Sequence, residues 1–196
     1  AQRTDDTCEK GHLTEDGKGQ ARGVGEKFAG KGPFYLAYSG YTRTLETCES
    51  IALGSGQSNA TPEVIEGLDG DYYIKDQNAY GNAKNAGGGS LNVYTRYVYR
   101  DMYAEAFYDL EKRSKEFVST YVLSNRSKLQ KVNFYISHDM MVLPFTVYAS
   151  QKKVNLRYFD NRNWLNYLTG TAIIINGEGA VRYVPVRGLE TGIQMI

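Results

Sequence analysis

Hydrophobic and polar positions follow two different periods in the first third of the chain. Residues 14–30 carry apolar side chains at helical spacing, with Thr14 as a suitable N-cap and glycines at the end of the pattern. Residues 33–38 are almost continuously apolar, which predicts a short strand buried in a parallel sheet. After a turn at 39–41, the pattern predicts a second helix over residues 42–52.

The middle of the chain is less regular. A short strand is expected at 63–65, and the region that follows, rich in Gly, Asn, Asp and Tyr, reads as an insertion over about 67–103. A long helix is expected over 104–123, with apolar residues near one face. Residues 132–136 form the second convincing strand, and an apolar helix over 140–149 contains a proline.

The C-terminal part predicts an aromatic loop at 156–168 and then a β-hairpin. Its strands, 171–175 and 180–184, flank the turn sequence Asn-Gly-Glu-Gly. Alternating helices and strands favour an α/β fold in three layers: a mainly parallel sheet with helices on both faces, and a C-terminal antiparallel hairpin. We expect a single domain over 1–196 that carries the insertion at about 67–103.

Composition limits the classes of function. A length of 196 residues suits one domain with a sizeable core, and 17 Tyr add buriable area to an apolar fraction of 41%. The net charge of +1 gives no indication of nucleic acid or of an anionic membrane surface, and no apolar run is long enough for a membrane span. The two cysteines, Cys8 and Cys48, show no zinc-type spacing; we expect free thiols, with one disulfide as the alternative.

Two polar clusters follow the two convincing strands: residues 39–43 and residues 137–139. Ligands in open α/β sheets bind beyond the carboxyl ends of the strands, so neighbouring strands would bring both clusters to one crevice. Arg43 falls in the first turn of its helix, where a cation is unfavourable unless an anion is bound there. A phosphate clamp is therefore one interpretation of Arg43, and an ordinary surface arginine is the other.

The pair His138-Asp139 supplies a group that titrates near neutral pH and a carboxylic acid at a strand end. The alternative is a half-buried histidine beside an aspartate that caps a turn. His12, the only other histidine, reads as a solvated loop residue, and two histidines make a multi-histidine metal centre improbable. The sequence has neither the G-x-S-x-G elbow of serine hydrolases nor a G-x-x-x-x-G-K-[ST] phosphate loop.

Three segments, in this order, resemble motifs of the histidine phosphatase superfamily. Residues 13–21 resemble its L-T-x-x-G-x-x-Q-A helix start, and residues 39–47 resemble its S-x-x-x-R-[AT]-x-x-T segment. Residues 136–139, Ile-Ser-His-Asp, resemble the strand end that carries its second histidine. The resemblance spans most of the chain apart from the insertion, and the His-Asp pair is closest to the acid phosphatase and phytase branch.

The resemblance implies hydrolysis of a small phosphate ester through a phosphohistidine, without metal or other cofactor. It makes His138 the second, charge-stabilising histidine, Arg43 a phosphate clamp and Asp139 the proton donor. In the branch that contains the mutases the acid is a glutamate nearer mid-chain, for which Glu66 is the candidate here. The acid phosphatase branch is often exported, so a periplasmic or secreted protein is expected, with a cytoplasmic one as the alternative.

One family motif is missing. The family's R-H-G-x-R-x-P sequence carries the nucleophilic histidine, and no Arg-His pair occurs in these residues. We expect the pair immediately before Ala1; Arg3 then takes the place of the motif's second arginine and joins the phosphate pocket. Three hypotheses remain: a phosphomonoesterase, a non-catalytic phosphate-binding module on the same fold, and a mutase-like enzyme that uses Glu66.

Overall fold

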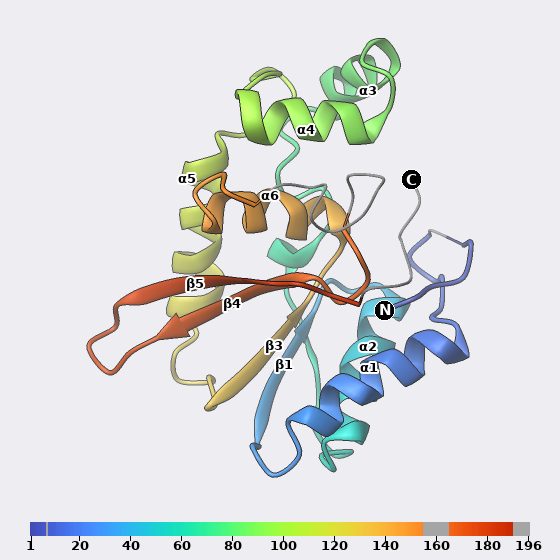
Figure 1. The fold of residues 1–196 in the computed structure, drawn as a ribbon, viewed down its shortest axis with the longest axis vertical. Coiled ribbons are helices and arrows are strands. Elements are labelled where there is room, and N and C mark those ends of the chain that lie inside the picture. The colour runs from blue at the N-terminus through green and yellow to red at the C-terminus, as the bar shows by residue number, and fades with distance from the viewer. Residues whose placement is uncertain (7, 155–164, 190–196) are drawn as a thin grey trace. The chain divides into compact units, whose positions relative to one another are not determined.

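The computed structural model describes residues 1–6, 8–154 and 165–189. It divides the chain into two compact units, drawn together in Figure 1. The first unit comprises Ala1–Gly70 and Phe117–His138, and the second comprises Asp71–Glu116 and Asp139–Ile196. The chain therefore passes between the units three times.

The first unit is built on a parallel three-stranded sheet. Its strand order is β2 (Glu63–Val64), β1 (Phe34–Tyr38), β3 (Val132–Ile136), so β1 lies in the centre. In the register of β1 with β3, Tyr38 stands opposite Ile136. The two strands consequently end side by side, and the residues that follow them emerge at one edge of the sheet.

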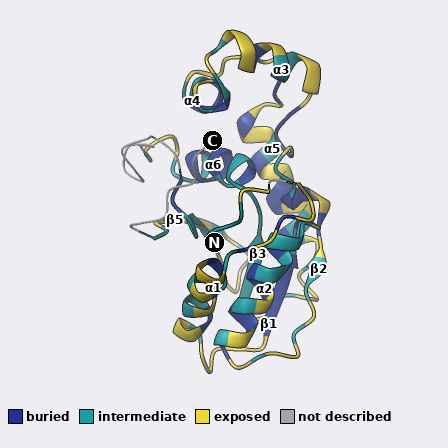
Figure 2. Ribbon diagram, turned by 90° about the vertical axis from the view of Figure 1, so that its right-hand side faces the viewer, coloured by how far each residue is buried: buried dark blue, intermediate teal, exposed yellow. Residues whose placement is uncertain are grey.

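Helices α1 (Glu15–Lys27) and α2 (Thr42–Gly54) belong to the same unit. Alternate residues of β1 point to α2 and form a buried cluster with it, and β1 is drawn in the buried colour in Figure 2. The buried members of this cluster are Phe34, Leu36, Cys48 and Ala52. Three rings, those of Phe28, Phe34 and Phe134, close the cluster in edge-to-face contacts.

The opposite face of the sheet packs against η2 (Val118–Leu123), a π-helical segment directly after α5 (Leu110–Phe117). Tyr35 and Tyr135 lie on this face with ring centroids 5.8 Å apart. The Tyr135 hydroxyl donates a hydrogen bond to the carbonyl of Tyr121 in η2. Helical segments thus cover both faces, and the predicted α/β fold with a parallel sheet is confirmed.

The second unit contains four helices and a hairpin among the residues described. The helices are α3 (Gln77–Ala86), α4 (Ser90–Arg100), α5 and α6 (Asp139–Ala149). Strands β4 (Gly170–Ile175) and β5 (Val181–Val186) pair antiparallel, which confirms the predicted hairpin. The hairpin packs on α6 through the rings of Phe145 and Tyr183, 5.8 Å apart.

The region predicted as a loose insertion is largely helical. The side chain of Asp76 caps α3 by accepting a hydrogen bond from the amide of Ala79. The tyrosines of this region contributed to its prediction as a loop. In the structure, Tyr94 and Tyr97 lie on the buried face of α4 and contact Phe107. Only the glycine run behaves as a break: Gly88 and Gly89, with φ of 80° and 99°, separate α3 from α4.

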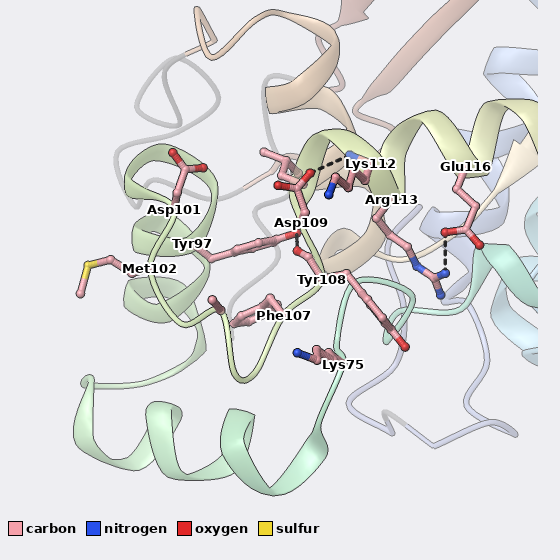
Figure 3. A pocket seen from close by; sticks show the side chains of 12 residues that line it. Lys75, Tyr97, Asp101, Met102, Phe107, Tyr108, Asp109, Lys112, Arg113 and Glu116 are labelled. Atoms are coloured by element: carbon pink, nitrogen blue, oxygen red, sulfur yellow. Dashed lines mark hydrogen bonds and ion pairs between the residues drawn. The ribbon is translucent and has the colours of Figure 1, made fainter.

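The helix predicted from residue 104 begins six residues later, at Leu110. Asp109 fixes the start of the helix at this point, because its carboxylate accepts a hydrogen bond from the backbone amide of Lys112 in the manner of an N-cap (Figure 3). Ahead of it, Tyr103 has a φ of 65° and Phe107 forms a β-bridge with Ile74. The description of 67–103 as an insertion into one domain stays a prediction.

Much of the predicted aromatic loop at 156–168 lies outside the described residues. Among the helices that the structure describes, none combines the length and the apolar character needed to cross a membrane.

Candidate active site

The two polar clusters singled out from the sequence meet at the carboxyl ends of β1 and β3. Ser39 follows β1 directly and is buried, and His138 comes two residues after the end of β3. The parallel register of these strands makes the two residues neighbours, although 99 positions separate them in the sequence. The two clusters therefore lie side by side at one edge of the sheet within the first unit.

Both ring nitrogens of His138 are engaged. Nδ1 lies 3.2 Å from Nη2 of Arg43, and Nε2 lies 2.7 Å from Oγ of Ser39. An arginine can only donate hydrogen bonds, so Nδ1 must accept and carries no proton. The proton of the neutral imidazole then resides on Nε2, which donates to Ser39.

The hydroxyls beyond Ser39 agree with this tautomer. Ser39 Oγ lies 2.9 Å from Thr44 Oγ1, which in turn donates to the carbonyl of Tyr41 at 2.8 Å. Since Thr44 has a single proton and gives it to that carbonyl, it must accept from Ser39. Every donor in the chain from Arg43 to the Tyr41 carbonyl is thereby accounted for, and His138 is held in one orientation.

Arg43 lies in the first turn of α2, as predicted. Its Nη1 donates to the carbonyl of Cys8 at 2.8 Å while Nη2 contacts His138, and the guanidinium stands over the Tyr41 ring at 4.6 Å. The same ring meets the imidazole of His138 edge-on, with centroids 4.6 Å apart. Tyr41 therefore packs against both the cation and the histidine, and the first turn of α2 contains no acidic residue.

Burial and charge together keep His138 neutral. Burial is the largest cause that lowers its pKa, from the usual 6.5 to about 4, and the positive charges of Arg43 and Arg3 act in the same direction. The carboxylate of Asp69 opposes them. The two arginines leave a positive charge beside a neutral imidazole, and this combination suits the binding of an anion. A bound anion would counteract the effect of the arginines and raise the pKa of His138.

Arg3 reaches the same site from the N-terminal segment. Residues 2–4 are fixed by backbone bonds from Thr14 to Gln2 and from Thr4 to His12, and Arg3 forms a β-bridge with Leu13. Helix α1 supports the segment closely. The structure thus brings Arg43 into contact with His138 and places Arg3 near enough for its charge to lower the pKa of that histidine.

The remaining candidates lie elsewhere. Asp139 is the first residue of α6 and belongs to the second unit, next to His138 in the chain. Glu66 begins the short 3₁₀ helix η1 (Glu66–Leu68) and its side chain is exposed. His12 is also exposed, and its Nδ1 pairs with the carboxylate of Glu46 at 2.8 Å, which agrees with its interpretation as a non-catalytic loop residue.

Sequence reasoning missed several residues that shape this site. The roles of Ser39 and Tyr41 depend on contacts with His138, which no local pattern reveals. Asp69 and Gly70 follow η1; a Cβ on Gly70 would stand 3.4 Å from Cβ of His138. The one usable signal was position, since a hydroxyl directly after a buried strand marks a polar carboxyl end.

Comparison with solved structures bears directly on the fold. YhfR of Bacillus stearothermophilus aligns over 92% of this chain and 86% of its own, with a TM-score of 0.59 and 15% identity. The phosphoglycerate mutase of Bacillus anthracis aligns over 92% and 82%, with a TM-score of 0.56 and 16% identity. The chain has the phosphoglycerate mutase fold. A mycobacterial glucosyl-3-phosphoglycerate phosphatase, solved with inorganic phosphate, also shares it, over 96% and 91% at a TM-score of 0.53 and 16% identity.

At the level of sequence, no family model matches the chain, and no curated protein matches it. Proteins with the phosphoglycerate mutase fold in this comparison include both a phosphatase and a mutase, and the fold alone does not distinguish these activities. No group of three or more His, Cys, Asp and Glu side chains that could hold a metal ion occurs in residues 1–6, 8–154 and 165–189.

Proposed function

We propose that the protein is a phosphomonoesterase that hydrolyses an organic phosphate through a phosphohistidine intermediate. The observation that carries the proposal is the cluster of Arg43, His138 and Ser39 at the carboxyl ends of β1 and β3. The cluster combines the planar guanidinium of Arg43 with the neutral imidazole of His138, which is held in one orientation. Both groups are suited to contact the oxygens of a phosphoryl group. Structural neighbours that include a phosphatase and a mutase support phosphoryl chemistry in general.

In this proposal Arg3 and Arg43 hold the phosphoryl oxygens, and His138 stabilises their charge. His138 is not the nucleophile, because Arg43 occupies the lone pair of Nδ1 and Nε2 carries the proton. The attacking histidine is assigned, by the resemblance, to the family's Arg-His motif. It forms a bond to phosphorus as the bond to the leaving oxygen breaks, and Asp139 gives that oxygen its proton. Water then releases phosphate and the histidine is restored.

Titration of His138 by NMR tests the anion site. Inorganic phosphate should raise the pKa of His138 from about 4, because a bound phosphate anion favours the imidazolium. Arg43→Gln should abolish the phosphate-induced shift. Arg22→Gln, on the neighbouring helix α1, provides a charge-matched control that should keep it. A pKa of His138 that does not change with phosphate at concentrations up to tens of millimolar would contradict the proposed anion site.

Turnover tests the identity of the acid and separates the acid phosphatase type from the mutase type. If Asp139 protonates the leaving group, Asp139→Asn should lower kcat on alkyl phosphates by about 10²–10⁴-fold, the usual contribution of general acid catalysis. The loss should be smaller on p-nitrophenyl phosphate, whose leaving group needs no proton. Glu66→Gln should leave both rates unchanged. The reverse outcome would favour a mutase-like enzyme that uses Glu66.

A non-catalytic phosphate-binding module is the second candidate. It is favoured by the engagement of both ring nitrogens of His138, which leaves this histidine no free lone pair for attack on phosphorus. It predicts that phosphate shifts the His138 titration while aryl and alkyl phosphates remain intact from acidic to neutral pH. Hydrolysis that disappears with His138→Ala would exclude it.

A further inference from the structure

The loop that precedes α1, residues 8–13, bonds to the first turn of α2. The amide of Thr42 donates to the carbonyl of Glu9 at 2.9 Å, at a helix start that no side chain caps. Nη1 of Arg43 donates to the carbonyl of Cys8 at 2.8 Å. The position of the Arg43 guanidinium therefore depends on where this loop lies.

Glu46, one turn further along α2, fastens the other end of the same loop. Its Oε2 accepts a hydrogen bond from the backbone amide of Leu13 at 2.7 Å, and its Oε1 lies 2.8 Å from Nδ1 of His12. Leu13 is 5% exposed and the side chain of Glu46 is 17% exposed, whereas that of His12 is 64% exposed. A charged acceptor makes the stronger kind of hydrogen bond, and an ion pair at the surface contributes little. The bond to the Leu13 amide is therefore the main attachment.

Leu13 also connects Glu46 to Arg3. It forms a β-bridge with Arg3, and backbone hydrogen bonds on either side of the bridge hold the two segments together. The carboxylate of Glu46 is thus linked, through the backbone of residues 8–13, to the segment of Arg3 and to the acceptor of Arg43.

The charge of Glu46 by itself opposes the binding of an anion. Burial raises the pKa of this carboxyl group, but the hydrogen bonds from His12 and Leu13 outweigh burial, and the pKa lies below its ordinary value of 4.5. Glu46 is consequently an anion at neutral pH, one turn from Arg43. Like charges repel, so any favourable effect of Glu46 on phosphate binding must come from its hydrogen bonds.

We propose that Glu46 is a positioning residue: by fixing residues 8–13 it orders Arg3 and Arg43, and thereby prepares the anion site that these arginines form with His138. Side chains that are ordered before binding spare the complex the entropic cost of immobilising them. The proposal rests on the proposed function in so far as the arginines bind a phosphoryl group, whereas the ordering of Arg43 is a property of the protein without phosphate.

Two substitutions at Glu46 separate its hydrogen bonds from its charge. Glu46→Ala removes both, and Glu46→Gln removes the charge but keeps an oxygen that can accept the Leu13 amide. The control, Glu49→Ala, removes a charge from an exposed position on the same helix. Phosphate affinity, measured from the chemical shifts of His138 at increasing phosphate, should fall about tenfold or more in Glu46→Ala and stay near the unsubstituted value in the other two. An effect of charge alone would instead strengthen binding in all three.

NMR of the Arg43 guanidinium without phosphate provides the second measurement. Rotation about its Nε–Cζ bond should be slow in the unsubstituted protein, in Glu46→Gln and in Glu49→Ala, and about tenfold or more faster in Glu46→Ala. If Glu46→Ala does not fold, Glu46→Asp replaces it, since this variant keeps the charge and withdraws the carboxylate by one carbon.

The outcomes distinguish the role of Glu46 from the proposed function. In a protein that binds phosphate, equal affinities of Glu46→Ala and Glu46→Gln would overturn the proposal, and so would equal rates of Arg43 rotation in these two variants. Rotation that depends on Glu46 in a protein that does not bind phosphate would contradict the proposed function, and would support the ordering of Arg43 by Glu46.

Discussion

At His138, the hydrogen bonds that fix the ring also determine which nitrogen holds the proton. Arg43 donates to Nδ1, and Ser39 receives the proton of Nε2 and passes its own to Thr44. Tyr41 packs against both His138 and Arg43. A site assembled in this way is ordered before any anion arrives, which lowers the entropic cost of binding.

Ser39→Ala should disorder His138. It removes the acceptor of Nε2 and leaves a partly buried donor unsatisfied, so we expect a loss of about 1–3 kcal/mol in the free energy of unfolding. Chemical denaturation measures this loss, and the nitrogen chemical shifts of His138 should show a mixture of tautomers. Ser50→Ala, in helix α2, is the control for loss of a serine hydroxyl elsewhere in the same unit. An unchanged tautomer in Ser39→Ala would contradict the hydrogen-bond relay.

The low pKa of His138 makes stability depend on pH. The unfolded chain binds this proton below pH 6.5, whereas the folded protein resists it down to about pH 4. Folding stability from this group is therefore complete above pH 6.5 and declines as the pH falls toward 4, by about 3 kcal/mol in total. Denaturation midpoints between pH 7 and pH 4.5 measure it. His138→Gln should make the free energy of unfolding less dependent on pH, whereas His12→Gln should leave the dependence unchanged. If the unsubstituted protein and both variants show the same pH dependence, His138 is not its source.

At the scale of elements, two helices position the arginines. Helix α2 carries Arg43 in its first turn, directly after β1. Helix α1 supports the segment of Arg3, and Gly17 allows the close approach, since a Cβ there would lie only 1.9 Å from the carbonyl oxygen of Gln2. Gly19, on the same helix, would meet nothing within 4 Å.

Gly17→Ala and Gly19→Ala should therefore act in opposite directions. An alanine at Gly19 should stabilise the protein by about 0.5–1 kcal/mol, the ordinary helix preference of alanine over glycine. An alanine at Gly17 should displace residues 2–4, lower the melting temperature and weaken phosphate binding through Arg3. Thermal unfolding and phosphate titration of both variants provide the measurement, and a stabilised Gly17→Ala protein would show that the close approach does not matter.

At the scale of the whole molecule, neither unit is a continuous segment of chain. The polypeptide leaves the first unit after Gly70, returns at Phe117 and leaves again after His138. His138 and Asp139 are therefore consecutive residues that belong to different units. Each unit has a core of its own, and that of the first contains Cys48, which is a free thiol like the exposed Cys8.

The two thiols should differ strongly in reactivity. Cys48 has no exposed surface and burial raises its pKa, so it should react with Ellman's reagent only when the first unit opens. Cys8 should react at once, and Cys8→Ser should remove the fast phase. Leu36→Ala, in the cluster around Cys48, should cost about 2–5 kcal/mol and accelerate the slow phase. Two equally fast thiols would contradict the described core.

The sequence by itself determined the local elements and the type of chemistry. Apolar-rich segments indicated β1 and β3, the spacing after Thr14 indicated α1, and the Asn-Gly-Glu-Gly turn indicated the hairpin, since each depends on neighbours in the chain. The positions of Arg43 and His138 at strand ends followed from the same patterns. The helices of the region 67–103 were missed because tyrosines supply much of their buried faces, beside only a few small or β-branched residues, so the usual aliphatic period is weak.

Only the tertiary structure decided how the site is assembled. The parallel register of β1 with β3 places Ser39 beside His138 across 99 residues, and no local preference encodes that distance. The same holds for the charge of His138, because its lowered pKa depends on burial and on arginines from two other segments. Contacts between distant residues set tautomer, charge and orientation, so the sequence identified the histidine and the fold determined its state.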